Sequence, residues 1–399
     1  LSAIAKRAGF TTRLWETSEI DLGHDTGEKR EVEVNIFKPV DLTPYNVEKK
    51  KIDVGTSFRK AFEEFKPAYV AFTVLNDERF WSGRISRLAK EIDPNVITIW
   101  GGKFPTLAPQ IVLDKWPVDY ICVGEGLEAF PELLSVLETG DDPSRIQNIW
   151  GVYRGRRFKN DVRPIKRNLD DLPYLDWEIY DQRHFYKPFD GKVMIGGDCM
   201  VNWGCPYHCT YCVNHFYHGL YNDKNVMRRY SVQRAIEELL FLARTYKLNF
   251  MKFHDEDFLL RPLRDFAEFS RAYAAQVGLP FTIETNSKSF SREKVKLLKE
   301  MNCVSASVAI ETGNQHLREK VLRRVDKRHE IINAFQLLKE FGIRSSAFNL
   351  LGLPYETRQT YLDTVQINKE AGVQYPNISY FFPYYGTVLR DIAIEQGNF

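Results

Sequence analysis

The second half of the chain repeats one pattern, in which a short apolar run typical of a buried strand precedes a segment with the periodicity of an amphipathic helix. From residue 191 onward the strand-like runs are KVMIGGDCMVNWG, LNFMKFHDEDF, PFTIETNS, CVSASVAIETG, IRSSAFNLLGLP and NISYFFPYYGT. Ser231 and Ser291 stand at the N-cap positions of two of the helical segments. The repeat predicts a partial (β/α)6 barrel or a truncated (β/α)8 barrel, with its polar strand ends at one rim.

The first 140 residues also alternate between helices and strands. The apolar runs AYVAFTVL, VITIWGG and VDYICVGEG are separated by helical segments, which predicts a parallel sheet with helices on both faces. The chain opens on a helical segment that ends at Gly9 and runs into a strand-like stretch, so we expect an earlier strand to be missing. We predict a Rossmann-like domain over 1–140, a linker over 141–190 with a hairpin around GVYRGRRFKN, and the barrel over 191–399.

The composition narrows the function only by exclusion. The formal net charge of +2 gives no indication of nucleic-acid binding. No apolar run reaches the length of about 18 residues that a membrane span needs, and no signal peptide is visible. Cys122, Cys199 and Cys303 are scattered and are expected to be buried as small hydrophobic residues. Few cysteines without an obvious pairing suggest a reducing, cytoplasmic compartment.

Three of the six cysteines are crowded into NWGCPYHCTYCVNHF, at Cys205, Cys209 and Cys212 with the spacing C-x3-C-x2-C. Three thiols cannot close a set of disulfides among themselves, so they indicate a site for a soft metal. One alternative is structural zinc, with His208 or His215 as the fourth ligand. The other is a [4Fe–4S] cluster whose three cysteines leave one iron open to a substrate.

This loop, with Tyr211 just before its last cysteine and a βα barrel behind it, resembles the radical SAM superfamily. The resemblance implies that the open iron binds S-adenosylmethionine. An electron from the cluster, supplied by a donor such as flavodoxin or ferredoxin, would then cleave it to methionine and a 5′-deoxyadenosyl radical. Tyr211 would pack near the adenine, and the GLPYET segment resembles the family's G-x-P-x-E-T, whose backbone lies beside it.

Further residues are assigned to S-adenosylmethionine by the same resemblance. Where the family often has Gly-Gly-Glu, this chain has FHDEDF, which leaves open which carboxylate binds the ammonium group. Asp255 and Asp257 should share one face and Glu256 the other, and we favour Asp255. Asn286 is the polar end residue of the third strand, and Glu311 lies where the family's ribose-binding carboxylate lies.

The front domain resembles the cobalamin-binding domain that precedes many radical SAM barrels. The resemblance rests on glycine turns at the strand ends and on a Thr-x-Leu segment. The residues it assigns to the cobalamin site are Thr73, Gly101, Gly102, Gly124 and Glu125. The histidine signature of base-off cobalamin is only partly matched, by DLGHDTG with His24, so we do not expect a His24–cobalt bond.

Two related interpretations fail on the residues. A methylthiotransferase needs three cysteines in the front domain, which has only Cys122, and a dinucleotide site needs G-x-G-x-x-G, which is not present. We therefore predict a cobalamin-dependent radical SAM enzyme that transfers a methyl group to an unactivated carbon or phosphorus centre. The alternatives are a ring-forming enzyme resembling the anaerobic protoporphyrin ester cyclases and a zinc-stabilised binding protein without catalysis.

Overall fold

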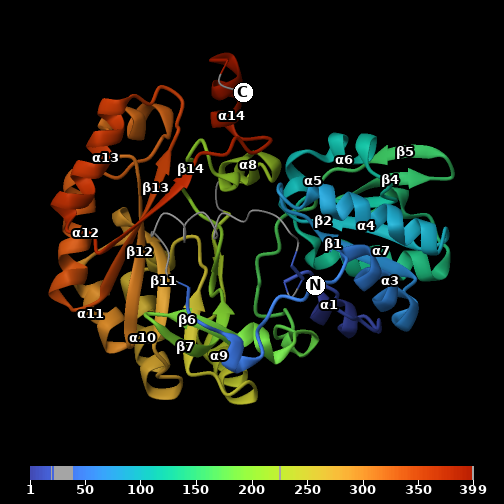
Figure 1. Cartoon of the computed structure of the whole chain (residues 1–399), viewed down its shortest axis with the longest axis horizontal. Coiled ribbons are helices and arrows are strands. Elements are labelled where there is room, and N and C mark those ends of the chain that lie inside the picture. The colour runs from blue at the N-terminus through green and yellow to red at the C-terminus, as the bar shows by residue number, and fades with distance from the viewer. Residues whose placement is uncertain (19, 22–38, 224–225, 398–399) are drawn as a thin grey trace. The chain divides into compact units, whose positions relative to one another are not determined.

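The computed structural model describes residues 1–18, 20–21, 39–223 and 226–397 (Figure 1). The chain folds as two compact units. The first comprises Leu1–Ile165 with Leu172–Met194, and the second comprises Lys166–Asp171 with Ile195–Phe399. The domain boundaries given above remain a prediction.

The first unit is built on a five-stranded sheet with the order β1-β2-β3-β4-β5. Its strands are β1 (Tyr69–Thr73), β2 (Ile97–Gly101), β3 (Tyr120–Cys122), β4 (Ile149–Tyr153) and β5 (Arg156–Lys159). Its helices are α1 (Ser2–Arg7), α3 (Val54–Phe65), α4 (Arg79–Ile92), α5 (Lys103–Leu107), α6 (Pro109–Lys115) and α7 (Gly126–Thr139). The first three strands are parallel, as predicted, and β4 and β5 form the predicted antiparallel hairpin.

Each face of this sheet carries its own apolar core, because alternate side chains of a strand point to opposite sides. On one face, Phe72 of β1 packs against Phe58 of α3 and Ile85 of α4. On the other, Ile99 of β2 packs against Leu133 of α7 and Ala5 of α1. Helices on both faces explain why the strands read as continuous apolar runs.

The strand that we predicted directly after Gly9 is not formed, and this expectation was wrong. Residues 10–16 have no strand assignment, and the Phe10 N–H instead bonds to the Ala5 carbonyl at the end of α1. Apolar residues in this stretch are used for packing, with Trp15 against Phe58. An apolar pattern alone does not make a strand, because a strand also needs a hydrogen-bonded neighbour.

The seven-stranded sheet is curled and mainly parallel with helices along its outer side, and its residues from Ile195 onward belong to the second unit (Figure 1). The strand order is β14-β13-β12-β11-β10-β7-β6. The strands are β6 (Tyr186–Phe189), β7 (Lys192–Cys199), β10 (Phe250–Phe253), β11 (Phe281–Asn286), β12 (Cys303–Glu311), β13 (Arg344–Leu351) and β14 (Tyr375–Tyr380). The helices are α8 (Val213–Leu220), α9 (Val232–Thr245), α10 (Leu263–Gln276), α11 (Arg292–Glu300), α12 (Arg328–Glu340), α13 (Arg358–Ala371) and α14 (Val388–Glu395). Six consecutive parallel strands, from β7 to β14, confirm the predicted partial barrel.

Local sequence explains where these elements begin and what holds them together. The Ser231 side chain accepts a hydrogen bond from the Arg234 N–H at 3.1 Å, and Ser291 caps α11 in the same way. Between the sheet and α10, the rings of Phe253, Phe258 and Phe281 are fully buried and in mutual contact. This aromatic core fixes the strand ends, where the polar residues lie.

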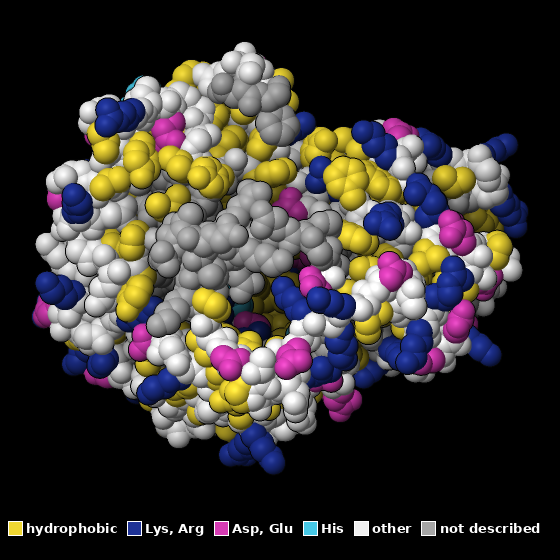
Figure 2. Space-filling model, viewed as in Figure 1, with side chains coloured by type: hydrophobic (Ala, Val, Ile, Leu, Met, Phe, Trp, Pro, Cys, Tyr) yellow, Lys and Arg dark blue, Asp and Glu magenta, His cyan; other side chains and the backbone are white. Residues whose placement is uncertain are grey.

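The surface gives little further indication of function. Among the described helices, none combines the length and the apolar character that a bilayer-spanning segment requires. On the face shown in Figure 2, basic and acidic side chains are interspersed, in keeping with the small net charge. Evidence for a function must therefore come from the polar residues at the strand ends.

Candidate functional site

The cysteine loop follows β7 and ends where α8 begins, with Cys212 as the N-cap residue of that helix. Cys209 is buried, Cys205 and Cys212 are partly exposed, and all three are free thiols. Burial raises the pKa of Cys209 to about 11, and the neighbouring Cys212 adds to this shift. A metal would have to replace these protons, because the thiolate is the ligand.

A buried carboxylate holds the start of the loop. Asp255, beyond the end of β10, is fully buried and accepts hydrogen bonds from the backbone N–H groups of Val201 and Asn202. Burial raises the pKa of Asp255 to about 7, although these N–H groups lower it. Glu256 is exposed and accepts a hydrogen bond from the Gly204 N–H at 3.2 Å. The predicted opposition of Asp255 and Glu256 is therefore observed.

A second network reaches the loop between Cys205 and Cys209. Asp257 is buried and accepts hydrogen bonds from the hydroxyls of Thr285, at the end of β11, and Ser289. Burial raises the pKa of Tyr207 in the loop to about 12, and Ser289 opposes this shift. Asn286 lies beside this network but uses its side chain to cap residues 287–289, accepting the Lys288 N–H at 2.9 Å.

A third network, which contains buried charges, reaches the loop between Cys209 and Cys212. The Tyr211 hydroxyl donates to Glu311 Oε1 at 3.0 Å and accepts from Arg324 Nη1 at 3.0 Å. Glu311 ends β12 with a φ of 64°, a left-handed conformation that is uncommon outside glycine and tends to occur at functional sites. Burial raises the pKa of Glu311, while Arg324 opposes this shift. The structure thus brings together Tyr211 and Glu311, which we predicted separately.

Thr210 connects the same part of the loop to two other segments. It is fully buried, its hydroxyl donates to the Val321 carbonyl at 2.6 Å, and its N–H donates to the Leu322 carbonyl at 3.0 Å. Its own carbonyl accepts the N–H of Leu389 in α14 at 3.0 Å. Residues Leu317–Val321 form a π-helix, an uncommon turn that often occurs at functional sites, and Thr210 satisfies carbonyls at its end.

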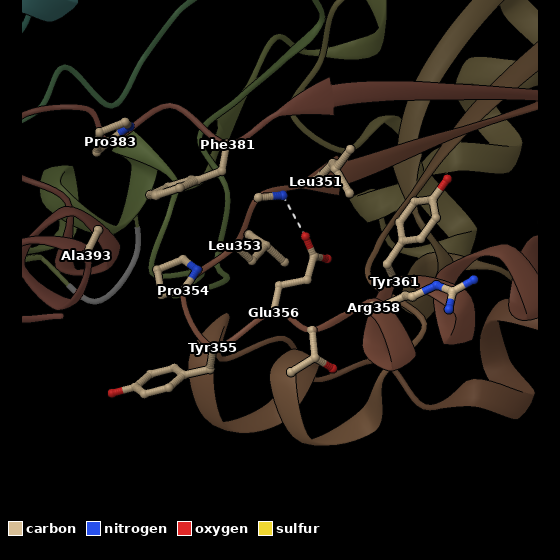
Figure 3. Close-up of a pocket in the computed structure, with 12 residues that line it drawn as sticks. Leu351, Leu353, Pro354, Tyr355, Glu356, Arg358, Tyr361, Phe381, Pro383 and Ala393 are labelled. Carbon is tan, nitrogen blue, oxygen red and sulfur yellow. Dashed lines mark hydrogen bonds between the residues drawn. The ribbon is translucent and has the colours of Figure 1, made fainter. Parts of the chain in front are cut away.

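A cavity of about 540 Å³ opens beside the GLPYET segment at the end of β13 (Figure 3). Glu356 Oε2 accepts the Gly352 N–H at 2.6 Å, whereas Oε1 is buried without a hydrogen-bond partner among the described residues. Leu353 and Phe381 line the cavity and also pack in one apolar cluster with Tyr211. The cavity and Tyr211 of the cysteine loop therefore border the same apolar cluster.

The first unit has a cavity of about 670 Å³ along β1 and the carboxyl ends of β2 and β3, a volume typical of cofactor sites. Thr73, Gly101, Gly102 and Gly124, which the resemblance assigned to cobalamin, line it, whereas Glu125 is not among the lining residues. Gly102 has a φ of 97°, and a Cβ atom there would lie 2.9 Å from the Val74 nitrogen. Gly102 therefore shapes the turn at the edge of this cavity.

The positions of the candidate ligands distinguish between the two sites that the sequence left open, one for zinc and one for a [4Fe–4S] cluster. Among the described residues, no group of three or more His, Cys, Asp or Glu side chains converges on a position for a single metal ion. The two candidate zinc-binding histidines contact each other, with 3.2 Å between His208 Nδ1 and His215 Nδ1. A [4Fe–4S] cluster needs no common point, because each cysteine binds a different iron. Three neighbouring free thiols on one anchored loop fit the cluster.

Sequence reasoning missed the residues that anchor the loop from outside. Arg324 and Ser289 carry no motif, and each acts through a contact between distant parts of the chain, while Asp326 holds Arg324 in place. The sequence offers one signal for Arg324 and Asp326. Both lie in the segment RRVD, in which basic and acidic residues stand together directly after an amphipathic segment. A charge run of this kind is usually solvated, so its burial is visible only in the structure.

The chain is similar to known proteins in both sequence and structure. Residues 202–367 match the family model of the radical SAM superfamily, and residues 33–134 match that of the B12-binding domain. The chain thus contains a radical SAM domain and a B12-binding domain. It is a radical SAM enzyme with a cobalamin-binding domain, as predicted, and its cofactors are a [4Fe–4S] cluster, S-adenosylmethionine and cobalamin. His24 lies outside the described residues.

Individual relatives are more distant. An uncharacterised methyltransferase of Pyrococcus horikoshii is 26% identical over 84% of this chain and 72% of its own length. An anaerobic magnesium-protoporphyrin IX monomethyl ester cyclase of Rubrivivax gelatinosus is 22% identical over 85% of this chain and 60% of its own length. The radical SAM methyltransferase TsrM of Kitasatospora setae, solved with tryptophan and a SAM analogue, shares the fold with a TM-score of 0.67 and 18% identity, covering 92% of this chain and 72% of that one.

Proposed function

We propose that this protein is a cobalamin-dependent methyltransferase that acts on an unactivated carbon or phosphorus centre. The observation that carries the proposal is the pairing of a cysteine loop anchored at the barrel rim with a B12-binding domain in one chain. When bound, the cluster supplies the electron that cleaves S-adenosylmethionine, and cobalamin carries the methyl group. The methyltransferase relative of P. horikoshii supports this chemistry.

The three cysteines have the clearest part in the proposal. Cys205, Cys209 and Cys212 would hold three irons of the cluster and leave the fourth open to S-adenosylmethionine. The protein's own task is to hold the loop in one place, because the reacting atoms must lie within van der Waals distance of one another. The buried hydrogen-bond networks that begin at Asp255, Asp257 and Glu311 hold the loop in place.

The residues predicted to bind S-adenosylmethionine fall into two groups. Tyr211 is hydrogen-bonded to Glu311 and packs against the apolar cluster that borders the GLPYET cavity, which supports the assignment of both residues to the adenosine part. Asp255 already accepts two backbone N–H groups in a fully buried position, so we assign it to holding the loop. The exposed carboxylate of Glu256 is then the candidate acceptor for the ammonium group, and Asn286 is a cap at the end of β11.

For cobalamin, we propose that the cavity along β1 takes the cofactor against Thr73, Gly101, Gly102 and Gly124. Gly101 has open space on its side-chain face, since an added Cβ would lie 3.9 Å or more from the nearest atoms. Small residues at this wall would let a bulky ligand approach the backbone. Glu125, which does not line the cavity, would act by starting α7.

We also propose a reducing compartment and a one-electron donor of the flavodoxin or ferredoxin kind, because the cluster needs an external electron. The second candidate reaction is ring formation, supported by the cyclase of R. gelatinosus at 22% identity. The methyltransferase relative is more similar, so methyl transfer is the first choice.

The test uses the full chain, reconstituted without oxygen with iron, sulfide and hydroxocobalamin. Corrinoid retained after gel filtration is counted against protein, and S-adenosylmethionine labelled in its methyl group is then added with a reductant. We expect retained corrinoid and label transferred to it. Protein that takes up iron but retains no corrinoid would contradict methyl transfer and leave the radical SAM assignment intact.

A further inference from the structure

Arg324 places a positive charge inside the protein at the cysteine loop. Its side chain is 3% exposed, and it donates from Nε to Asp326 Oδ1 at 2.9 Å. Nη1 donates to the Tyr211 hydroxyl and Nη2 to the Ala309 carbonyl, both at 3.0 Å. A guanidinium keeps its charge when buried, so this is a fixed cation held in a single orientation by its planar fork.

Arg324 belongs to a buried group of four charged side chains whose charges balance. Glu311 Oε1 lies 3.9 Å from Arg324 Nη1, and Asp326 is fully buried with Oδ1 on Arg324. Arg318, also fully buried, lies with its Nε 3.8 Å from Asp326 Oδ2, and Thr312 supplies a carbonyl to its guanidinium. Two buried cations thus face two buried anions, and only Arg324 of the cations bonds directly to a residue of the loop.

The link to the loop passes through Tyr211, which stands between two of the cysteines. The Tyr211 hydroxyl accepts from Arg324 Nη1 at 3.0 Å, and Tyr211 precedes Cys212 directly in the chain. The guanidinium is therefore held beside the part of the loop that carries Cys209 and Cys212.

We propose that Arg324 is a positioning residue that raises the electron affinity of the cluster held by the three cysteines, an inference that rests on the proposed function. One electron from an external reductant enters the cluster, and no bond forms or breaks in that step. The electron adds negative charge beside three thiolates in a water-poor site. A fixed cation stabilises the reduced form more than the oxidised form, because Coulomb interactions are strong where solvent does not screen them.

The proposal predicts two shifts of opposite sign. Arg324→Met keeps the length of the side chain but removes its charge, so the reduction equilibrium should become less favourable by about tenfold, which is ~59 mV for one electron. Asp326→Asn keeps the shape but releases Arg324 from its counter-charge, so reduction should become more favourable by a smaller factor. Arg324→Lys keeps the charge and loses the fork, and its potential should stay near that of the unchanged protein.

The measurement is a redox titration of the reconstituted full chain, followed by the electron paramagnetic resonance signal of the reduced cluster and without S-adenosylmethionine. Arg234→Met is the matched control, because Arg234 forms a comparably buried ion pair with Glu238 at 2.9 Å on α9. We expect this control to leave the potential unchanged. A merely structural defect would lower cluster content in both Arg324→Met and Asp326→Asn without giving shifts of opposite sign.

The outcomes separate the inference from the proposed function. Equal potentials in Arg324→Met and the unchanged protein would overturn the inference, as would shifts of the same sign in Arg324→Met and Asp326→Asn. If Arg324→Met does not hold iron, Asp326→Asn alone decides, since an unchanged or lowered potential there contradicts the proposal. Unchanged protein that forms no cluster at all would overturn the proposed function and the inference together.

Discussion

The two candidate sites of this chain are built in different ways. At the cysteine loop, buried side chains with charges and hydroxyls hold the site: Arg324 and Asp255 bond to the loop from different segments, and Thr210 of the loop bonds to the Val321 carbonyl. In the cavity along β1, glycines, Thr73 and apolar side chains line the wall at the ends of the parallel strands, and the polar side chains that also border the cavity, such as Arg13, Lys66 and Glu138, lie elsewhere on its wall. A site for redox chemistry thus depends on particular functional groups, whereas a site for a large cofactor depends on the shape of the backbone.

The first prediction concerns the first unit, where we expect the largest effect on stability. Gly102→Ala puts a side chain at a φ of 97° and a ψ of −165°, a region that only glycine adopts readily, and brings it 2.9 Å from the Val74 nitrogen. We expect a loss of roughly 3 kcal/mol in the free energy of unfolding, together with loss of corrinoid binding. Urea unfolding and corrinoid retention measure the two effects.

The matched control is Gly155→Ala in the β4–β5 hairpin. Gly155 has a φ of 74°, and an added Cβ there would meet no atom within 4 Å. It should therefore lose only about 1 kcal/mol, the ordinary penalty of a left-handed alanine, and retain corrinoid. Equal stability losses in the two variants would show that the close approach at Gly102 is not what shapes the cavity wall.

The second comparison concerns a hydroxyl at the cysteine loop. Thr210→Val keeps the shape of the side chain but leaves the Val321 carbonyl without its 2.6 Å donor. We expect the protein without cofactors to lose about 1–2 kcal/mol in the free energy of unfolding, and the reconstituted protein to lose iron faster to a chelator. Thr210→Ser restores the donor and should hold iron nearly as long as the unchanged protein. Equal rates of iron loss in the valine and serine variants would argue against the hydroxyl as an anchor.

Much of the fold and part of the site could be predicted from the sequence. The βα repeat, the caps at Ser231 and Ser291 and the three cysteines are local patterns with local physical causes. The strand predicted after Gly9 was wrong, because pairing depends on a neighbour that a local pattern does not reveal. Arg324 was missed for a related reason, since its partners lie at 211, 309 and 326 and meet only in the folded chain.

The smallest expected effect is a pH dependence at the barrel rim. Two carboxylates bond to His254 and raise its pKa from 6.5 to about 9, Asp198 with the larger effect and Glu284 with the smaller. The stability that this group contributes is therefore fully present below pH 6.5 and is lost as the pH rises through about 9. Because all three side chains are more than one third exposed, the loss should not exceed ~1 kcal/mol. Urea unfolding of the unchanged protein and of His254→Gln at pH 6 and pH 9.5 would measure this loss of stability. A loss of the same size in His254→Gln would assign the effect to another group.

The central claim is that three cysteines on one anchored loop hold a cluster that cleaves S-adenosylmethionine. The most direct measurement is the release of 5′-deoxyadenosine by the anaerobically reconstituted full chain after addition of S-adenosylmethionine and a reductant. We predict release from the unchanged protein and from Cys303→Ala, which alters a buried cysteine of β12 away from the loop, and none above background from Cys209→Ala. Release that persists in Cys209→Ala, or that fails in the unchanged protein loaded with iron and sulfide, would contradict the account.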